Sequence, residues 1–113
     1  MAEGQRFKVV IAASGRRRYR QTILVYLLKH FSLERVIEIE DSLGDKIQSL
    51  SFQPFRGTRE LTISNIDQEA RFILFKETRI LELKIIYVID KGESQVALVD
   101  LFPTRMNPSK IGK

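Results

Sequence analysis

The stretch RILELKIIYVID, residues 79–90, decides the fold, because it is the longest run in the chain with the alternation of a β-strand. One face of this strand is apolar apart from a tyrosine hydroxyl: Leu81, Leu83, Ile85, Tyr87 and Ile89. The other face is mixed: Ile80, Glu82, Lys84, Ile86 and Val88. Because an apolar sheet face is buried by packing, we expect helices to cover the first face. Glu82 and Lys84 are then expected in a partly open groove on the mixed face.

Downstream of this strand, the sequence predicts a hairpin and one more strand. KGES at 91–94 reads as a hairpin turn, and QVALVDLF at 95–102 is a hydrophobic strand of the kind found inside sheets. PTRMNPSKI at 103–111 follows at once and contains Arg105, an Asn-Pro break and a lysine. The last strand therefore delivers a basic, conformationally restricted segment to the edge or mouth of the sheet, where we expect function.

Upstream, RFILF at 71–75 predicts a further strand, joined to residues 79–90 by a turn at 76–78. The residues from 61 to 69 fit either a short strand or an irregular stretch. SFQPFRGTRE at 51–60 predicts a loop, since a proline and a glycine interrupt it.

Two helices are predicted between a first strand, at 6–13, and that loop. Ser14 can N-cap the first helix, which extends to about Phe31. Ser32 can N-cap the second helix, which is weakened somewhat by Gly44 in its interior. The second helix has one apolar stripe: Val36, Ile39, Leu43, Ile47 and Leu50. Because only Ser32 and its neighbours separate the helices, we expect an antiparallel helical hairpin.

The order of the elements is β-α-α-β-β-β, with no internal repeat and no low-complexity segment. Helices followed by a run of strands are typical of α+β domains. The sequence therefore predicts an α+β fold in which the N-terminal helical hairpin packs on one face of an antiparallel sheet. A chain of 113 residues fits one domain, which we expect to span residues 1–113.

The composition excludes several kinds of site. The chain has no cysteine, so disulfides, thiolate metal ligands and cysteine catalysis are ruled out. Its single histidine, His30, falls in the predicted first helix, which argues against a zinc site or a Ser-His-Asp triad. We therefore expect no metal and no cofactor. Since no signal peptide is visible and no apolar run is long enough to span a bilayer, we expect a cytoplasmic protein without a membrane partner.

The chain is basic, with a net charge of +5 and a pI of about 9.7. This excess favours an anionic partner such as nucleic acid, a ribosome or an acidic protein; the alternative is a basic surface without such a role. Candidate nucleic-acid contacts lie at the start of the first helix and in the loop: Arg16, Arg17, Arg18, Arg56 and Arg59. Because arginines at a helix N-terminus oppose the helix dipole, two interpretations stay open: a functional gain, or a solvated end whose arginines pair with acidic residues.

The aromatic residues are interpreted as core rather than as platforms for base stacking, because aromatic side chains dominate core burial. This expectation covers five phenylalanines: Phe52, Phe55, Phe72, Phe75 and Phe102.

Four passages, in their order and spacing, carry a family resemblance. LSFQP at 50–54 with Gly57 follows the helical hairpin, and ARFIL at 70–74 opens a strand with an arginine near its start. KIIYVI at 84–89 and TRMNP at 104–108 complete the set. Together they resemble the RelE/ParE superfamily of toxins from type II toxin–antitoxin, or plasmid stabilisation, modules. In that superfamily the corresponding passages are "L..P..G", a strand that often begins with Arg, "YRIIYxI" and "(F)HTRxNP".

The resemblance implies a compact toxin that inhibits growth and is neutralised by an antitoxin. Many RelE-type members cut mRNA in the ribosomal A site, whereas ParE-type members act on DNA gyrase. Arg71 matches the strand arginine that contacts phosphate in the ribonucleases, and Arg105 matches the signature arginine that helps to stabilise their cleavage transition state. Lys84 stands where the family often has arginine, and Tyr87 matches a strand tyrosine with a packing role.

RNA cleavage by 2′-hydroxyl attack needs a base, a cation for the phosphorane charge and an acid for the leaving oxygen. The catalytic candidates are Arg71, Lys84 and Arg105, with Glu82 or Lys84 as the base. A lysine base needs a strongly depressed pKa. Pro103 stands where the signature commonly has histidine, which rules out a histidine acid at that position, and no tyrosine follows Arg105. The alternative is that these charged residues form cross-strand ion pairs on an exposed sheet face.

The leading hypothesis is therefore a toxin that cleaves mRNA on the ribosome and is bound by an acidic antitoxin. The alternatives are a non-enzymatic inhibitor of DNA gyrase, a degenerate non-toxic homologue, and a basic nucleic-acid-binding domain outside the family. An acidic, partly disordered antitoxin fits the positive charge of the chain. We expect an edge strand, either residues 6–13 or the strand after Pro54, to accept an added strand from it.

Overall fold

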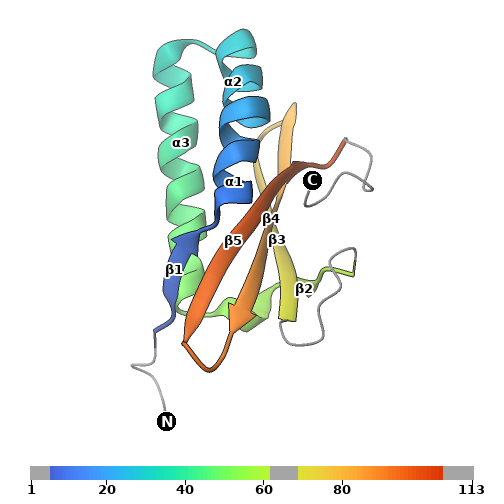
Figure 1. Ribbon diagram of the computed structural model, residues 1–113. Coiled ribbons are helices and arrows are strands. Elements are labelled where there is room, and N and C mark those ends of the chain that lie inside the picture. The colour runs from blue at the N-terminus through green and yellow to red at the C-terminus, as the bar shows by residue number, and fades with distance from the viewer. Residues whose placement is uncertain (1–5, 62–68, 106–113) are drawn as a thin grey trace.

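A computed structural model describes residues 6–61 and 69–105 of the chain. Its centre is a five-stranded sheet with the strand order β1-β5-β4-β3-β2, and helices cover one face of it (Figure 1). The strands are β1 Lys8–Ile11, β2 Thr58–Arg59, β3 Glu69–Thr78, β4 Leu81–Asp90 and β5 Gln95–Pro103. The helical segments are α1 Ala13–Arg18, η1 Tyr19–Ile23, α2 Leu24–His30, α3 Leu33–Gln48, η2 Ser49–Ser51 and η3 Pro54–Arg56. The expected α+β fold, with a helical hairpin on one face of the sheet, is confirmed.

One strand pairing differs from a fully antiparallel sheet. β1 runs parallel to β5, with Val9 opposite Val96 and Ile11 opposite Leu98, while the other neighbouring strands are antiparallel. The helical hairpin returns the chain to the end of the sheet where β1 began. From that end β3 runs in the direction of β1, β4 runs back, and β5 runs in the direction of β1 again. β5 is therefore parallel to β1, and the sheet is mixed.

The three long strands form two hairpins. The turn at Lys91–Ser94 joins β4 to β5 as expected. β3 is longer than predicted: residues 76–78 belong to the strand, and the turn falls at Arg79–Ile80. The predicted loop at 51–60 contains η3 and the short strand β2, which pairs with β3. Most of the undecided stretch at 61–69 lies outside the described residues.

The first helix is continuous from Ala13 to His30 and contains one π-helical turn, η1. The prediction that Ser14 caps this helix is wrong, because the helix begins two residues earlier than predicted and its N-cap is Ala12. The Ser14 hydroxyl donates instead to the carbonyl of Val99 in β5 (2.7 Å). The serine therefore ties the start of the helix to the sheet.

The second helix, α3, has the predicted cap and stripe. The Ser32 hydroxyl accepts a hydrogen bond from the Arg35 N–H (3.1 Å), as an N-cap side chain does. The whole stripe is buried: Val36, Ile39, Leu43, Ile47 and Leu50. α3 runs back alongside α1 and α2 (Figure 1), which confirms the antiparallel hairpin. No helix within residues 6–61 or 69–105 has both the length and the apolar character needed to cross a membrane.

The core lies between the helices and one face of the sheet. The apolar face of β4 is buried as predicted, with exposed fractions between 0% and 4%: Leu81, Leu83, Ile85, Tyr87 and Ile89. The Tyr87 hydroxyl donates to the Pro54 carbonyl (2.6 Å), and burial raises the pKa of Tyr87 above its ordinary value. The tyrosine therefore stays protonated at neutral pH and anchors η3 to the sheet, which agrees with its predicted packing role.

Two glycines of the helical hairpin should respond oppositely to alanine. A Cβ atom at Gly15 would lie 2.6 Å from Leu98 Cδ2 and 2.9 Å from the Leu98 carbonyl oxygen, because α1 crosses β5 closely there. The same position at Gly44 in α3 is open space. We predict that Gly15→Ala lowers the free energy of unfolding by about 1–3 kcal/mol. Gly44→Ala should raise it by about 0.5–1 kcal/mol. Urea unfolding followed by circular dichroism measures both, and changes of the same sign would contradict the close approach.

Candidate functional site

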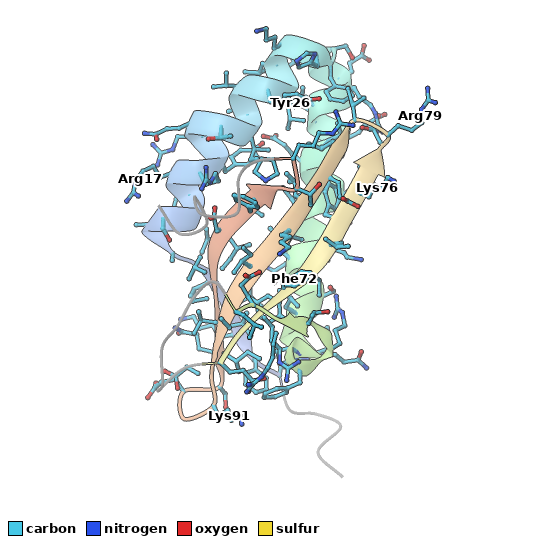
Figure 2. All side chains as sticks on the ribbon, turned by 90° about the vertical axis from the view of Figure 1, so that its right-hand side faces the viewer. Arg17, Tyr26, Phe72, Lys76, Arg79 and Lys91 are labelled. Carbon is cyan, nitrogen blue, oxygen red and sulfur yellow. The ribbon has the colours of Figure 1, made fainter. Side chains whose placement is uncertain are left out.

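The candidate site lies on the face of the sheet turned away from the helices. Figure 2 shows this face, with Phe72 near its middle. Its centre is a small apolar cluster: Phe72, Ile86, Val99 and Phe102. As predicted, Glu82 and Lys84 stand on this face of β4, and both are only partly buried. The face is therefore an apolar patch with charged side chains around it.

At one side of this cluster, a buried ion pair joins α1 to β5. Arg18 Nε lies 2.8 Å from Asp100 Oδ1, and the two side chains are only 9% and 2% exposed. The Arg18 guanidinium also lies 5.7 Å from the centre of the Phe102 ring. Removing either partner would leave a buried charge without this partner, so the pair holds α1 against β5. Arg18, predicted as a nucleic-acid contact, is placed here in a structural role.

At the other side of the cluster, Lys84 pairs with Glu60. Lys84 Nζ lies 3.2 Å from Glu60 Oε1 and 4.2 Å from the centre of the Phe72 ring. Glu60 is 5% exposed, and a buried carboxylate needs such a partner. An ammonium that donates to a buried carboxylate is poorly placed to take a proton from a substrate. Of the two candidate bases, the geometry therefore favours Glu82.

A hollow opens where β5 ends and the β3–β4 turn meets the first helix. Its volume is about 310 Å³. The lining residues come from η1, α2, the β3–β4 hairpin and the end of β5: Thr22, Ile23, Tyr26, Lys76, Arg79, Ile80, Leu81, Glu82, Pro103, Thr104 and Arg105. The Tyr26 hydroxyl donates to the Ile80 carbonyl (3.1 Å) and fixes α2 against the turn. Figure 2 shows Tyr26, Lys76 and Arg79 at this end of the sheet.

The hollow is rich in positive charge. Within the described residues, Lys76, Arg79 and Arg105 make no ion pair with a carboxylate. Glu82 Oε1 accepts a hydrogen bond from Thr104 Oγ1 (2.9 Å), and the Thr104 N–H donates to the Glu82 carbonyl (3.1 Å). These bonds hold the chain before Arg105 against β4. The arrangement suits a phosphodiester, with a carboxylate beside it to accept a proton. No three potential metal ligands gather anywhere in the described part of the chain.

The structure places Arg71 away from this hollow. It stands opposite Tyr87, and the distance along β4 from Tyr87 to Glu82 at the hollow is about 17 Å. Its guanidinium donates to the Gly57 carbonyl and pairs with Glu69. Arg71 therefore fixes the segment around Gly57. Of the catalytic candidates, only Glu82 and Arg105 line the same hollow.

The four other arginines predicted to contact nucleic acid are exposed but belong to two separate segments. Arg16 and Arg17 lie on α1, where Arg16 donates to the last carbonyl of β1 (3.0 Å). Arg56 and Arg59 belong to the η3–β2 segment, where Arg56 donates to the Ser49 carbonyl (3.2 Å). Arg17 extends away from the helix in Figure 2. Each of the two segments therefore carries two of these arginines.

Comparisons with known proteins give one structural likeness. No protein-family model matches the sequence, and no curated protein matches it. The solved toxin–antitoxin complex RelBE2 from Mycobacterium tuberculosis contains a chain that is similar to this one. The similarity has a TM-score of 0.48 and 15% sequence identity, and it covers 87% of this chain and 91% of that chain. A likeness of this size transfers neither residue roles nor activity.

Sequence reasoning missed several residues of the hollow. Lys76 is predicted in a turn and Arg79 in a strand, so the sequence alone did not place them together. The register of the β3–β4 hairpin sets Lys76 directly opposite Glu82. Cross-strand neighbours share a face of the sheet, so a predicted hairpin register is the signal that would have found this pair.

The expectation that the phenylalanines are core residues is wrong for two of the five. Phe52 is 58% exposed and Phe55 is 42% exposed, whereas the other three are buried or partly buried. The physical reason is that the η2–η3 segment is anchored by Leu50 and Pro54, both buried. The two rings beside these anchors are left at the surface.

The buried ion pair on β5 gives a testable prediction. Asp100→Ala removes the carboxylate that pairs with Arg18, so we expect the free energy of unfolding to fall by about 3–5 kcal/mol. Arg17→Ala changes an exposed neighbour of the same helix and should stay within about 0.5 kcal/mol of the wild type. Equilibrium urea unfolding compares the two variants. Equal, small effects would show that the pair does not hold α1 against β5.

Proposed function

We propose that this chain is the toxin of a type II toxin–antitoxin module and inhibits growth by cleaving mRNA on the ribosome. The observation that carries the proposal is the hollow at the end of the sheet, where Lys76, Arg79 and Arg105 surround Glu82. The four passages that resemble RelE/ParE toxins support it, because the arginine that matches the family signature, Arg105, lines this hollow. Because the proposed target is mRNA on the ribosome, we propose that the chain acts in the cytoplasm.

In this mechanism, the cations of the hollow bind the scissile phosphodiester. Guanidinium groups bind two phosphate oxygens at once, and Arg105 stabilises the charge that develops on the phosphorane. Glu82, oriented by the Thr104 hydroxyl, takes the proton of the 2′-hydroxyl. The 2′-oxygen forms a bond to phosphorus while the bond to the 5′-oxygen breaks. Lys76 returns a proton to that leaving oxygen, since lysine releases a proton more readily than arginine.

The two remaining catalytic candidates take supporting roles in this proposal. Lys84 neutralises Glu60 and Arg71 pairs with Glu69, so neither cation is free to bind a phosphate in this arrangement. Lys84 stabilises the buried Glu60 carboxylate on the open face beside the hollow. Arg71 holds the segment around Gly57 in place.

Substitutions at the hollow test the ribonuclease proposal. Arg105→Ala should reduce mRNA cleavage by about 100-fold or more, the usual loss when one donor to the transition-state charge is removed. Glu82→Gln should also reduce it by about 100-fold or more, because an amide cannot accept the proton. Each variant is expressed in a bacterial host, and cuts in cellular mRNA are mapped by primer extension. Arg17→Ala, which lies outside the hollow, should cut like the wild type.

A non-enzymatic inhibitor of DNA gyrase is the second candidate function. Two observations favour it: Lys84 and Arg71 are occupied by carboxylates, and Pro103 lines the hollow where the family signature commonly has histidine. The same experiment separates the two functions. Growth arrest with intact mRNA and damaged DNA would overturn the ribonuclease proposal in favour of the gyrase inhibitor. Normal growth of cells that make the folded chain would overturn both.

We also propose that an acidic antitoxin covers β1 and the groove beside it. β1 is one edge of the sheet, and within the described residues the outward N–H and C=O groups of Val9 have no partner. An apolar groove of about 240 Å³ adjoins this edge, between α1 and α3. Its lining includes Ile11, Leu43, Ile47 and Leu98. A strand added to β1 can therefore place apolar side chains in the groove, with its acidic residues near Lys8 and Arg16. The other edge, β2, has only two residues.

A charge placed in this groove should weaken antitoxin binding. Ile11→Lys puts an ammonium among apolar side chains, so we expect the dissociation constant to rise about tenfold or more. Leu28→Lys changes an exposed leucine of α2 that does not line the groove and should have no such effect. Titration calorimetry with the antitoxin, to be sought as a short acidic protein encoded beside the gene for this chain, measures both. Equal affinities for the two variants would place the antitoxin elsewhere.

A further inference from the structure

The end of the sheet opposite the Arg105 hollow carries exposed aromatic rings. Phe52 lies just before η3 and Phe55 lies within it, and their side chains are 58% and 42% exposed. Phe7 packs edge-on against Phe55, with the ring centres 5.9 Å apart. We call these three rings the phenylalanine patch. Lys91, which belongs to this end, and Arg79, which lines the hollow, lie at opposite ends of the sheet in Figure 2.

Cations lie against the rings of this patch. The Arg6 guanidinium is 4.8 Å from the centre of the Phe52 ring. Lys91 Nζ is 5.5 Å, and the Arg71 guanidinium 5.9 Å, from the centre of the Phe55 ring. These distances are those of cation–π contacts. Positive charge and exposed ring surface therefore occur at the same place.

The charge around the patch is positive overall. Arg56 and Arg59 follow the patch in sequence and are exposed. Glu69 is the carboxylate beside the rings, and it pairs with Arg71 and, at 3.9 Å, with Lys91. Arg6, Arg56 and Arg59 form no ion pair within the described residues. Asp90 and Glu93 border Lys91 in the β4–β5 turn. Together with Glu69 they make three carboxylates against five cations, so the surface keeps a positive excess that attracts anions.

We propose that the phenylalanine patch binds single-stranded RNA. Aromatic rings stack on the face of any unpaired base, while arginine and lysine side chains contact the phosphates between bases. An acidic protein would be attracted by the same charge and can also bury exposed rings, so competition by an acidic chain is an arm of the test below. A duplex keeps its base faces covered. Unpaired bases that are splayed out are the form in which proteins usually read RNA. This binding is independent of the proposed cleavage, because the patch and the hollow lie at opposite ends of the sheet.

Fluorescence anisotropy with the full chain and a labelled oligouridylate of about eight nucleotides tests the proposal. Phe52→Leu and Phe55→Leu keep an apolar side chain of similar size but remove the ring, so each should weaken binding about fivefold or more. Phe52→Tyr and Phe55→Tyr keep the ring and should bind within about twofold of the wild type. Thermal unfolding confirms that each variant is folded. If Phe55→Leu unfolds because it loses the ring contact with Phe7, the comparison of Phe52→Leu with Phe52→Tyr decides the result.

Salt dependence tests the contribution of the cations. Arg59→Ala should lower the slope of log K against log salt by about 0.7, the value for one phosphate contact on a single strand. Lys29→Ala removes the same charge from an exposed site on α2 and should leave the slope unchanged. Leucine variants that bind like the wild type would overturn the proposal. Equal binding of an RNA duplex, or equal competition by polyglutamate, would also overturn it, because charge alone would then explain the binding.

Discussion

The structure depends on packing one face of β4 against the helices while Glu82 and Lys84 on the other face stay partly exposed. Every second side chain from Leu81 to Ile89 is apolar and packs against the helices, and both edges of the strand are hydrogen-bonded, to β3 and β5. A shift of one residue in register would move Glu82 and Lys84 into the core, at a large cost in desolvation. The single helical layer is the consequence: helices cover only the apolar side, and the charged residues of β4 remain on an accessible surface.

The accessible face is stabilised by charges that are already paired. Arg18 with Asp100 and Lys84 with Glu60 border the small cluster around Ile86 and Phe102. The register of β4 against β5 shifts near Val99, whose carbonyl accepts the Ser14 hydroxyl beside Asp100. At this bulge, β5 contacts α1 at two neighbouring residues: Val99 bonds Ser14, and Asp100 pairs with Arg18. Among the cations without a carboxylate partner in the described chain, two groups lie at the two ends of the sheet, where we propose phosphate and RNA binding.

Local patterns in the sequence were sufficient for the elements but not for their long-range contacts. The alternation in β4, the stripe of α3 and the cap at Ser32 each depend on neighbouring residues, and each is confirmed. The parallel pairing of β1 with β5 joins strands that are far apart in the sequence, so no local pattern encodes it. The same holds for the site: Arg105 was found through the family motif, whereas Lys76 and Arg79 join it only through the hairpin register. Phe52 is exposed because Leu50 and Pro54 anchor its segment, and the amino-acid composition cannot predict which residues of a segment act as anchors.

We propose that the hollow lined by Glu82 and Arg105 acts on RNA presented by a ribosome. The most direct measurement uses purified bacterial ribosomes programmed with one defined mRNA, to which the purified chain is added, with the 3′ ends of the products mapped by primer extension. We expect a cut within the codon in the A site that requires both the ribosome and the chain. Intact mRNA on ribosomes incubated with a chain that arrests growth when expressed would contradict it.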